Sequence, residues 1–174
     1  MNRDARIEAL LDKQAITELS YRYSRACDRL DRELLESVYW PDGTDDHGAF
    51  VGSAPDYVDW VMGLLSGWTA VHHDNTNILI DLDGDTATGE VHWTGYYSYP
   101  VGGVSHDHLA VGRYIDRYER RGGEWRIKHR TCLSDWSRIE PGADWRTDPA
   151  RSRLAGKRKP HDLLYQARTL GAAD

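Results

Sequence analysis

The chain has 174 residues, with 22 Lys and Arg against 28 Asp and Glu, which gives a formal net charge of −6. Hydrophobic residues make up 40% of it, including seven Trp and ten Tyr, so it has the composition of a folded domain and not of a disordered chain. A negative charge without a basic stripe disfavours nucleic acid as a partner. No apolar run is long enough for a membrane span and no apolar signal core opens the chain, so we expect a cytoplasmic protein.

The first 65 residues have the apolar period of helices. The spacing predicts helices over 5–30, over 32–40 and over 54–65. Pro41 cannot continue the second helix, and Asp42-Gly43 after it is typical of a turn. Ser53 precedes the third helix at an N-cap position.

From residue 70 the apolar period changes to two, which predicts strands. Glycine-containing turns, the clearest being Asp83-Gly84-Asp85, separate four expected strands at 71–82, 86–99, 106–120 and 124–136. Helices followed by such a meander indicate an α+β fold, in which N-terminal helices pack in a strongly curved antiparallel sheet. That shape leaves a pocket open at one end, suited to a small-molecule substrate.

One domain, residues 1–138, accounts for these elements. Residues 139–174, which Gly and Pro interrupt, form a tail that we expect to pack on the domain or on a neighbouring protomer, through side chains that include Trp145 and Tyr165. An open sheet rich in Tyr and Trp leaves an apolar face exposed, so we expect a homodimer or a homotrimer.

Two polar residues near the end of the first predicted helix are candidates for chemistry. Tyr23 and Asp28 lie about 140° apart around the helix, so both could border a cavity at its end. The alternative for Asp28 is an exposed ion pair with Arg25, three residues earlier.

A polar run opens the first predicted strand. Alternation places His73 and Asn75 on one face, and His72 and Asp74 on the other. An imidazole facing a cavity can act as a general base near neutral pH, and a carboxylate on its other nitrogen would fix its tautomer. A one-residue slip of the strand would exchange the two histidines, so His72 remains a competitor.

The pair His106 and His108 has the spacing of two metal ligands on one strand face, but no third ligand follows at a recognisable spacing. We therefore expect no metal. The chain also lacks the glycine-rich and serine-containing motifs of nucleotide-dependent enzymes and serine hydrolases, so we expect no cofactor.

Several of these motifs together resemble the SnoaL-like branch of the NTF2-like superfamily over roughly residues 5–138. They are Tyr-x-x-x-x-Asp at the end of the first helix, Tyr39-Trp40-Pro41-Asp42, the run His72–Asn77, the hairpin Asp83–Ala87 and the last strand from Trp125 to Arg130. The resemblance is greatest to dehydratase-like members with an Asp–His dyad, such as scytalone dehydratase, hexachlorocyclohexane dehydrochlorinase and bile-acid 7α-dehydratase.

The resemblance implies four catalytic residues. Asp28 and His73 match the dyad, Tyr23 matches a tyrosine of the bile-acid enzyme, and Arg130 matches an arginine on the last strand of the dehydrochlorinase. The substrate-binding candidates are polar and aromatic residues of the expected pocket wall: Trp40, Asn75, Trp93, Tyr97, His108 and Tyr114.

These residues favour a cofactor-independent lyase of the dehydratase type, acting on a small, cyclic, mostly apolar hydroxy-carbonyl compound. An isomerase or polyketide cyclase would use the same base. A binding or scaffold subunit, like the small subunit of ring-hydroxylating dioxygenases, would not need the dyad.

Overall fold

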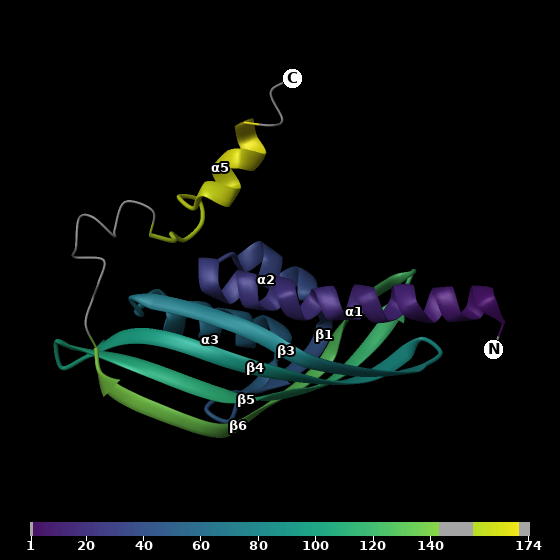
Figure 1. The fold of residues 1–174 in the computed structure, drawn as a ribbon, viewed down its shortest axis with the longest axis horizontal. Helices are drawn as coiled ribbons and strands as arrows, with labels where there is room; N and C mark the ends of the chain where they lie inside the picture. Colours follow the sequence, from purple (N-terminus) through teal and green to yellow (C-terminus); the bar gives the residue numbers. More distant parts are fainter. Residues whose placement is uncertain (1, 143–154, 171–174) are drawn as a thin grey trace.

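Three helices lie on one face of a curved sheet in the computed structural model, which describes residues 2–142 and 155–170 (Figure 1). The helices are α1 (Arg3–Arg29), α2 (Arg32–Val38) and α3 (Ala54–Ser66). None of the helices in the described part of the chain has the length and apolar character of a membrane span.

Each of these helices begins with a side-chain cap. Asn2 Oδ1 accepts a hydrogen bond from the Ala5 amide at 2.9 Å, and Asp31 and Ser53 cap α2 and α3 in the same way. The cap predicted at Ser53 is thus confirmed. Leu30, which ends α1, has a φ of 51° and turns the chain directly into α2.

The sheet has six strands in the order β2-β1-β6-β5-β4-β3. Their bounds are β1 (Tyr39–Asp46), β2 (Val51–Ser53), β3 (Ala70–Asp83), β4 (Thr86–Val101), β5 (Val104–Arg121) and β6 (Glu124–Pro141). Strands β3 to β6 form the predicted antiparallel meander, and Gly84 adopts the positive φ that its tight turn requires. The predicted α+β architecture is confirmed, with each of the four strands longer than expected.

The region after α2 corrects three sequence predictions. The second helix ends at Val38 and not at residue 40, and the expected turn at Asp42-Gly43 lies inside β1. Strand β1 pairs parallel with β6, so the sheet is mixed and not purely antiparallel. The pairing shifts between Tyr39 and Thr44, where Pro41 has no amide hydrogen for the ladder, and this irregularity resembles a turn in the sequence.

The core lies between the helices and the concave face of the sheet. It is lined by apolar and aromatic side chains, among them Ile16, Leu19, Tyr23, Tyr57, Val91, Trp93, Tyr114 and Ile127. Strand register places His73 opposite Gly95, and Tyr97 opposite His108. Because side chains alternate along a strand, His73, Tyr97 and His108 all face this core.

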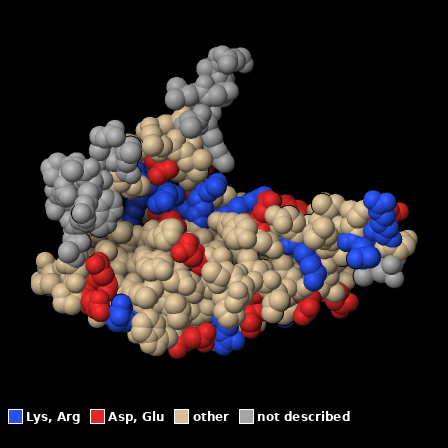
Figure 2. Space-filling view, viewed as in Figure 1, with Lys and Arg blue, Asp and Glu red and all other residues tan. Residues whose placement is uncertain are grey.

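The C-terminal segment returns to the helices and ends in α5 (Leu163–Leu170), drawn in yellow in Figure 1. Lys159 bonds Asp31 and Glu33 through its ammonium group, each at 2.9 Å, and its amide donates to the Arg29 carbonyl at 2.8 Å. Lys and Arg side chains gather where this segment meets the helices (Figure 2). Trp145, expected in the packing of the tail, lies outside the described residues.

Candidate active site

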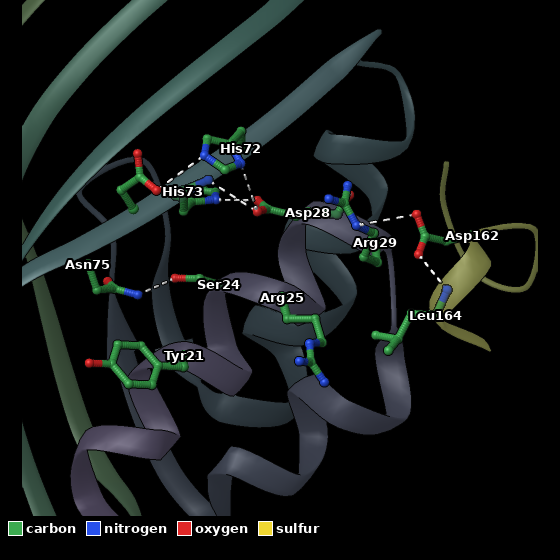
Figure 3. Close-up of a pocket in the computed structure, with 11 residues that line it drawn as sticks. Tyr21, Ser24, Arg25, Asp28, Arg29, His72, His73, Asn75, Asp162 and Leu164 are labelled. Atoms are coloured by element: carbon green, nitrogen blue, oxygen red, sulfur yellow. Dashed lines mark hydrogen bonds and ion pairs between the residues drawn. The ribbon is translucent and has the colours of Figure 1, made fainter. Parts of the chain in front are cut away.

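The end of α1 meets the start of β3 through Asp28 and His73 (Figure 3). Asp28 Oδ1 accepts a hydrogen bond from His73 Nδ1 at 2.7 Å, and Oδ2 accepts from the backbone amide of the same histidine at 3.1 Å. Asp28 is only 7% exposed, so the alternative of an exposed ion pair with Arg25 is wrong. The predicted contact between Asp28 and His73 is confirmed.

The two neighbouring histidines have different environments. The His73 side chain is 9% exposed, whereas the His72 side chain is 55% exposed and lies 3.2 Å from the Asp74 carboxylate. His72 also comes within 3.8 Å of Asp28 Oδ2, too far for a hydrogen bond. The strand register therefore selects His73 as the partner of Asp28.

The tautomer of His73 follows from its partners. An ionised carboxylate can only accept, so Nδ1 carries the proton and Nε2 carries the lone pair. Tyr97 Oη donates to this Nε2 at 3.1 Å. Burial raises the pKa of Tyr97, so its hydroxyl remains a proton donor. Asp28, His73 and Tyr97 form a chain of carboxylate, imidazole and phenol.

Gly95 makes the contact of Tyr97 possible. A Cβ at this glycine would lie 1.9 Å from the Tyr97 hydroxyl, because the phenol ring crosses over the backbone of Gly95 to reach His73. A side chain at this position and the observed placement of Tyr97 are incompatible.

Two further candidates lie beside this chain. Asn75 Nδ2 donates to Ser24 Oγ at 2.6 Å and to the Ser20 carbonyl at 3.2 Å, which fixes β3 against α1. The ring of His108 lies 5.6 Å from that of Tyr97, and burial lowers the pKa of this histidine. Asn75 Oδ1 and His108 Nε2 are buried and have no hydrogen-bond partner within the described residues.

A groove of about 500 Å³ reaches Asp28 and His73 from outside. It lies between α1, the start of β3 and the C-terminal segment, which contributes Asp162 and Leu164 (Figure 3). The other lining residues are mainly polar or charged: Tyr21, Ser24, Arg25, Arg29, His72, Asp74 and Asn75. The aromatic surface expected around the dyad lies instead on the opposite, core side of His73, where Tyr97 is placed.

Two of the four predicted catalytic residues do not join the dyad. The Tyr23 hydroxyl contacts the Tyr57 hydroxyl and the His47 imidazole, on the side of α1 turned away from Asp28. Arg130 is fully buried and its guanidinium bonds the Asp116 carboxylate twice, at 2.8 and 2.6 Å. The reason is the pitch of α1, since five residues rotate Tyr23 to a different wall from Asp28.

The three Trp and Tyr candidates not yet described do not line the groove at the dyad. Trp93 and Tyr114 stack with their ring centroids 5.7 Å apart and are buried in the core. Trp40 points to the other face of β1, where the guanidinium groups of Arg121 and Arg126 lie 4.8 and 5.0 Å from its ring. Trp40 therefore lines a separate pocket beside α2 and α3 and not the groove at the dyad, which corrects the expectation, because Tyr39 next to it takes the inward position.

A family model for the SnoaL-like domain matches residues 8–131, which is most of the folded part of the chain. The chain belongs to the SnoaL-like domain family. A comparison with curated proteins gives no match.

Solved structures share the fold of this SnoaL-like domain. They include the protein Kfla4162 from Kribbella flavida, with 23% identity, coverage of 75% of this chain and 95% of that chain, and a TM-score of 0.68. A putative scytalone dehydratase from Novosphingobium aromaticivorans has 20% identity, coverage of 78% and 91%, and a TM-score of 0.68. The hexachlorocyclohexane dehydrochlorinase LinA-type3 from Novosphingobium barchaimii has 22% identity, coverage of 79% and 94%, and a TM-score of 0.67.

Sequence reasoning missed one constellation in this SnoaL-like domain. His47 contacts Asp45 through Nδ1, and its Nε2 lies 3.2 Å from the Tyr23 hydroxyl. The signal in the sequence is Asp45-Asp46-His47, an Asp and a His two residues apart, which the apparent turn at Pro41 made look like a loop. Within the described ranges no group of three or more His, Cys, Asp or Glu could hold a metal ion, His106 and His108 included.

Proposed function

We propose that this SnoaL-like domain is an acid–base lyase of the dehydratase type, which eliminates water from a small cyclic hydroxy-carbonyl compound without a cofactor. The observation that carries the proposal is the chain formed by Asp28, His73 and Tyr97, at 2.7 and 3.1 Å. It places a general base and a phenol that can act as general acid within hydrogen-bond distance of each other, and an elimination of water needs both.

In the proposed reaction, the Tyr97 hydroxyl turns from His73 Nε2 to the leaving hydroxyl group of the substrate, and the freed lone pair of Nε2 removes the proton from the carbon next to the carbonyl group. The electron pair of that C–H bond forms the new C=C bond, and the hydroxyl group leaves with the proton of the Tyr97 phenol as water. The Tyr97 oxygen then recovers a proton from the imidazolium of His73, so both side chains return to their starting states. Asp28 stabilises the imidazolium through its hydrogen bond to Nδ1.

The protonation states fit these roles. Burial raises the pKa of Tyr97, so the phenol starts the reaction protonated. Proton transfers of this kind are each worth about two to four orders of magnitude in rate. Tyr97 thus takes the place of Tyr23, which the resemblance gave as the catalytic tyrosine, because the Tyr97 hydroxyl contacts His73 whereas the Tyr23 hydroxyl contacts His47.

A panel of cyclic β-hydroxy ketones, with products analysed by mass spectrometry, tests the proposal. We expect loss of one water molecule from at least one compound, and a fall in rate of about 100-fold or more in His73→Gln. His92→Gln, which replaces a half-buried histidine on β4 that bonds Glu90, is the matched control and retains the rate. A product of unchanged mass would show isomerisation by the same base. A rate in His73→Gln equal to that of the wild type would refute the mechanism.

A further inference from the structure

A second Asp–His pair faces α1 from the same face of the sheet, near the edge opposite β3. Asp45 lies on β1 and His47 directly after it, whereas His73 lies on β3 at the opposite edge. Asp45 is 1% exposed, its Oδ1 contacts His47 Nδ1, and its Oδ2 accepts from the Tyr39 hydroxyl at 2.6 Å. Because the carboxylate can only accept, Nδ1 of His47 carries the proton and Nε2 has a free lone pair.

Two phenol groups converge on that lone pair. His47 Nε2 lies 3.2 Å from the Tyr23 hydroxyl and 3.3 Å from the Tyr57 hydroxyl, and the two hydroxyls contact each other. The lone pair of Nε2 accepts one of the two phenol protons, and the other phenol proton forms the contact between the two hydroxyls. One of the three contacts therefore has no proton of its own. The cluster is one proton donor short, and the hydroxyl group of a ligand is a donor of this kind.

Arg130 supplies an independent observation. Its Nε and Nη2 bond Asp116, and its guanidinium carbon lies 4.2 Å from the ring centre of Tyr23. Arg130 is 0% exposed, and its Nη1 has no hydrogen-bond partner within the described residues. A buried, charged N–H group without an acceptor indicates a position that a ligand or water oxygen fills.

The charge around the cluster restricts the ligand. Asp45 and Asp116 carry two negative charges against the single positive charge of Arg130, so an anion would be repelled and a neutral molecule is favoured. The His47 side chain is 15% exposed and is the member of the cluster that reaches the surface. The ring of Trp60 lies 6.5 Å from it, which favours an aromatic or alicyclic ligand.

We propose that His47, held by Asp45 and flanked by the hydroxyls of Tyr23 and Tyr57, is a second acid–base centre that binds a neutral phenol or enol through its oxygen. The ligand hydroxyl passes its proton to His47 Nε2, which leaves an oxyanion beside an imidazolium and does not change the net charge of the site. Arg130 Nη1 and the phenol hydroxyls donate to that oxyanion. Burial raises the pKa of both tyrosines, so they remain donors.

Binding of 4-nitrophenol tests this centre without any turnover, since its absorbance distinguishes phenol from phenolate. At a pH below the pKa of the free probe, we expect the bound probe to contain a larger phenolate fraction than the free probe. His47→Gln should abolish that excess and weaken binding at least tenfold, and Tyr57→Phe should weaken binding about tenfold. His92→Gln changes a half-buried histidine and Tyr96→Phe an exposed tyrosine, both on β4. They are the matched controls, which bind the probe as the wild type does.

Asp28→Asn separates this centre from the dyad. Unchanged probe binding in Asp28→Asn supports binding of the probe at His47. Loss of probe binding in Asp28→Asn, with wild-type binding in His47→Gln, would overturn the proposal and leave the proposed elimination standing. Absence of binding to the wild type would also overturn it. If His47→Gln fails to fold, ring signals of ¹⁵N-labelled histidine in the wild type replace it: a shift of the His47 signals on titration supports the centre, and unchanged signals refute it.

Discussion

Replacement of Asp28 by Asn is the sharpest test of how the dyad is built. Asp28 accepts two hydrogen bonds from one residue, His73 Nδ1–H at 2.7 Å and the His73 amide at 3.1 Å. An asparagine has one acceptor and one donor end. Either rotation of its amide therefore places an N–H group against an N–H group, at a site that is only 7% exposed.

The magnitude follows from that geometry. One buried donor without an acceptor costs about 1–3 kcal/mol, so Asp28→Asn should lower the free energy of unfolding by this amount. His73 can escape the conflict by moving its proton to Nε2, which removes the lone pair that would act as a base. We therefore also expect the elimination rate to fall by about two to four orders of magnitude.

Urea denaturation measures the stability change, and ¹⁵N shifts of the imidazole ring report the tautomer. Asp81→Asn, an exposed change on the same strand, should alter the free energy of unfolding by no more than about 0.5 kcal/mol. An Asp28→Asn protein with wild-type stability and a His73 that keeps its proton on Nδ1 would show that the two hydrogen bonds do not set the tautomer.

Three further outcomes are expected. Gly95→Ala should displace Tyr97 from His73, seen as a changed imidazole ¹⁵N signal, because its Cβ would lie 1.9 Å from the Tyr97 hydroxyl. Arg130→Ala should lower the free energy of unfolding by about 3–5 kcal/mol in urea, since it leaves a buried carboxylate without its partner. Burial alone would raise the pKa of Asp31, but hydrogen bonds, chiefly from Lys159, lower it overall. The ionised Asp31 therefore stabilises the folded protein fully above about pH 4, and this contribution is lost as the pH falls below that value. Limited proteolysis of the C-terminal segment should detect the loss.

Matched variants give these three expectations their controls. Gly63→Ala, on an exposed turn of α3 with no atom within 4 Å of the added Cβ, should stabilise the protein by about 0.4–1 kcal/mol. Arg117→Met removes an exposed arginine of β5 and should change stability by less than about 0.5 kcal/mol. Proteolysis of the C-terminal segment that does not depend on pH between 5 and 3 would contradict the role of Asp31.

The pairing of Asp28 with His73 was predicted through the family resemblance. A strand period of two and a helix pitch of 3.6 give the faces on which the two residues lie, but they do not give the partner of either residue. The same helix rule placed Tyr23 about 140° from Asp28 around α1. Because of this angle, Tyr23 faces His47 whereas Asp28 faces His73. Strand β1 was missed because it is held by pairing with β6, more than 80 residues away, while Pro41 and Gly43 resemble a turn. The placement of Tyr97 over Gly95 depends on the curvature of the finished sheet, which no local pattern contains.

The C-terminal segment has a consequence for how the protein can be shortened. Arg158 donates to the carbonyls of Leu65 and Trp68 at 2.9 and 2.7 Å, at the end of α3, while Lys159 holds the end of α1 through Arg29. A recombinant fragment trimmed to the family match would leave these carbonyls to water and remove one wall of the groove at the dyad. We expect such a fragment to fold less stably and to expose the Asp28 carboxylate to solvent, so tests of the proposed activity call for a protein that keeps the C-terminal segment.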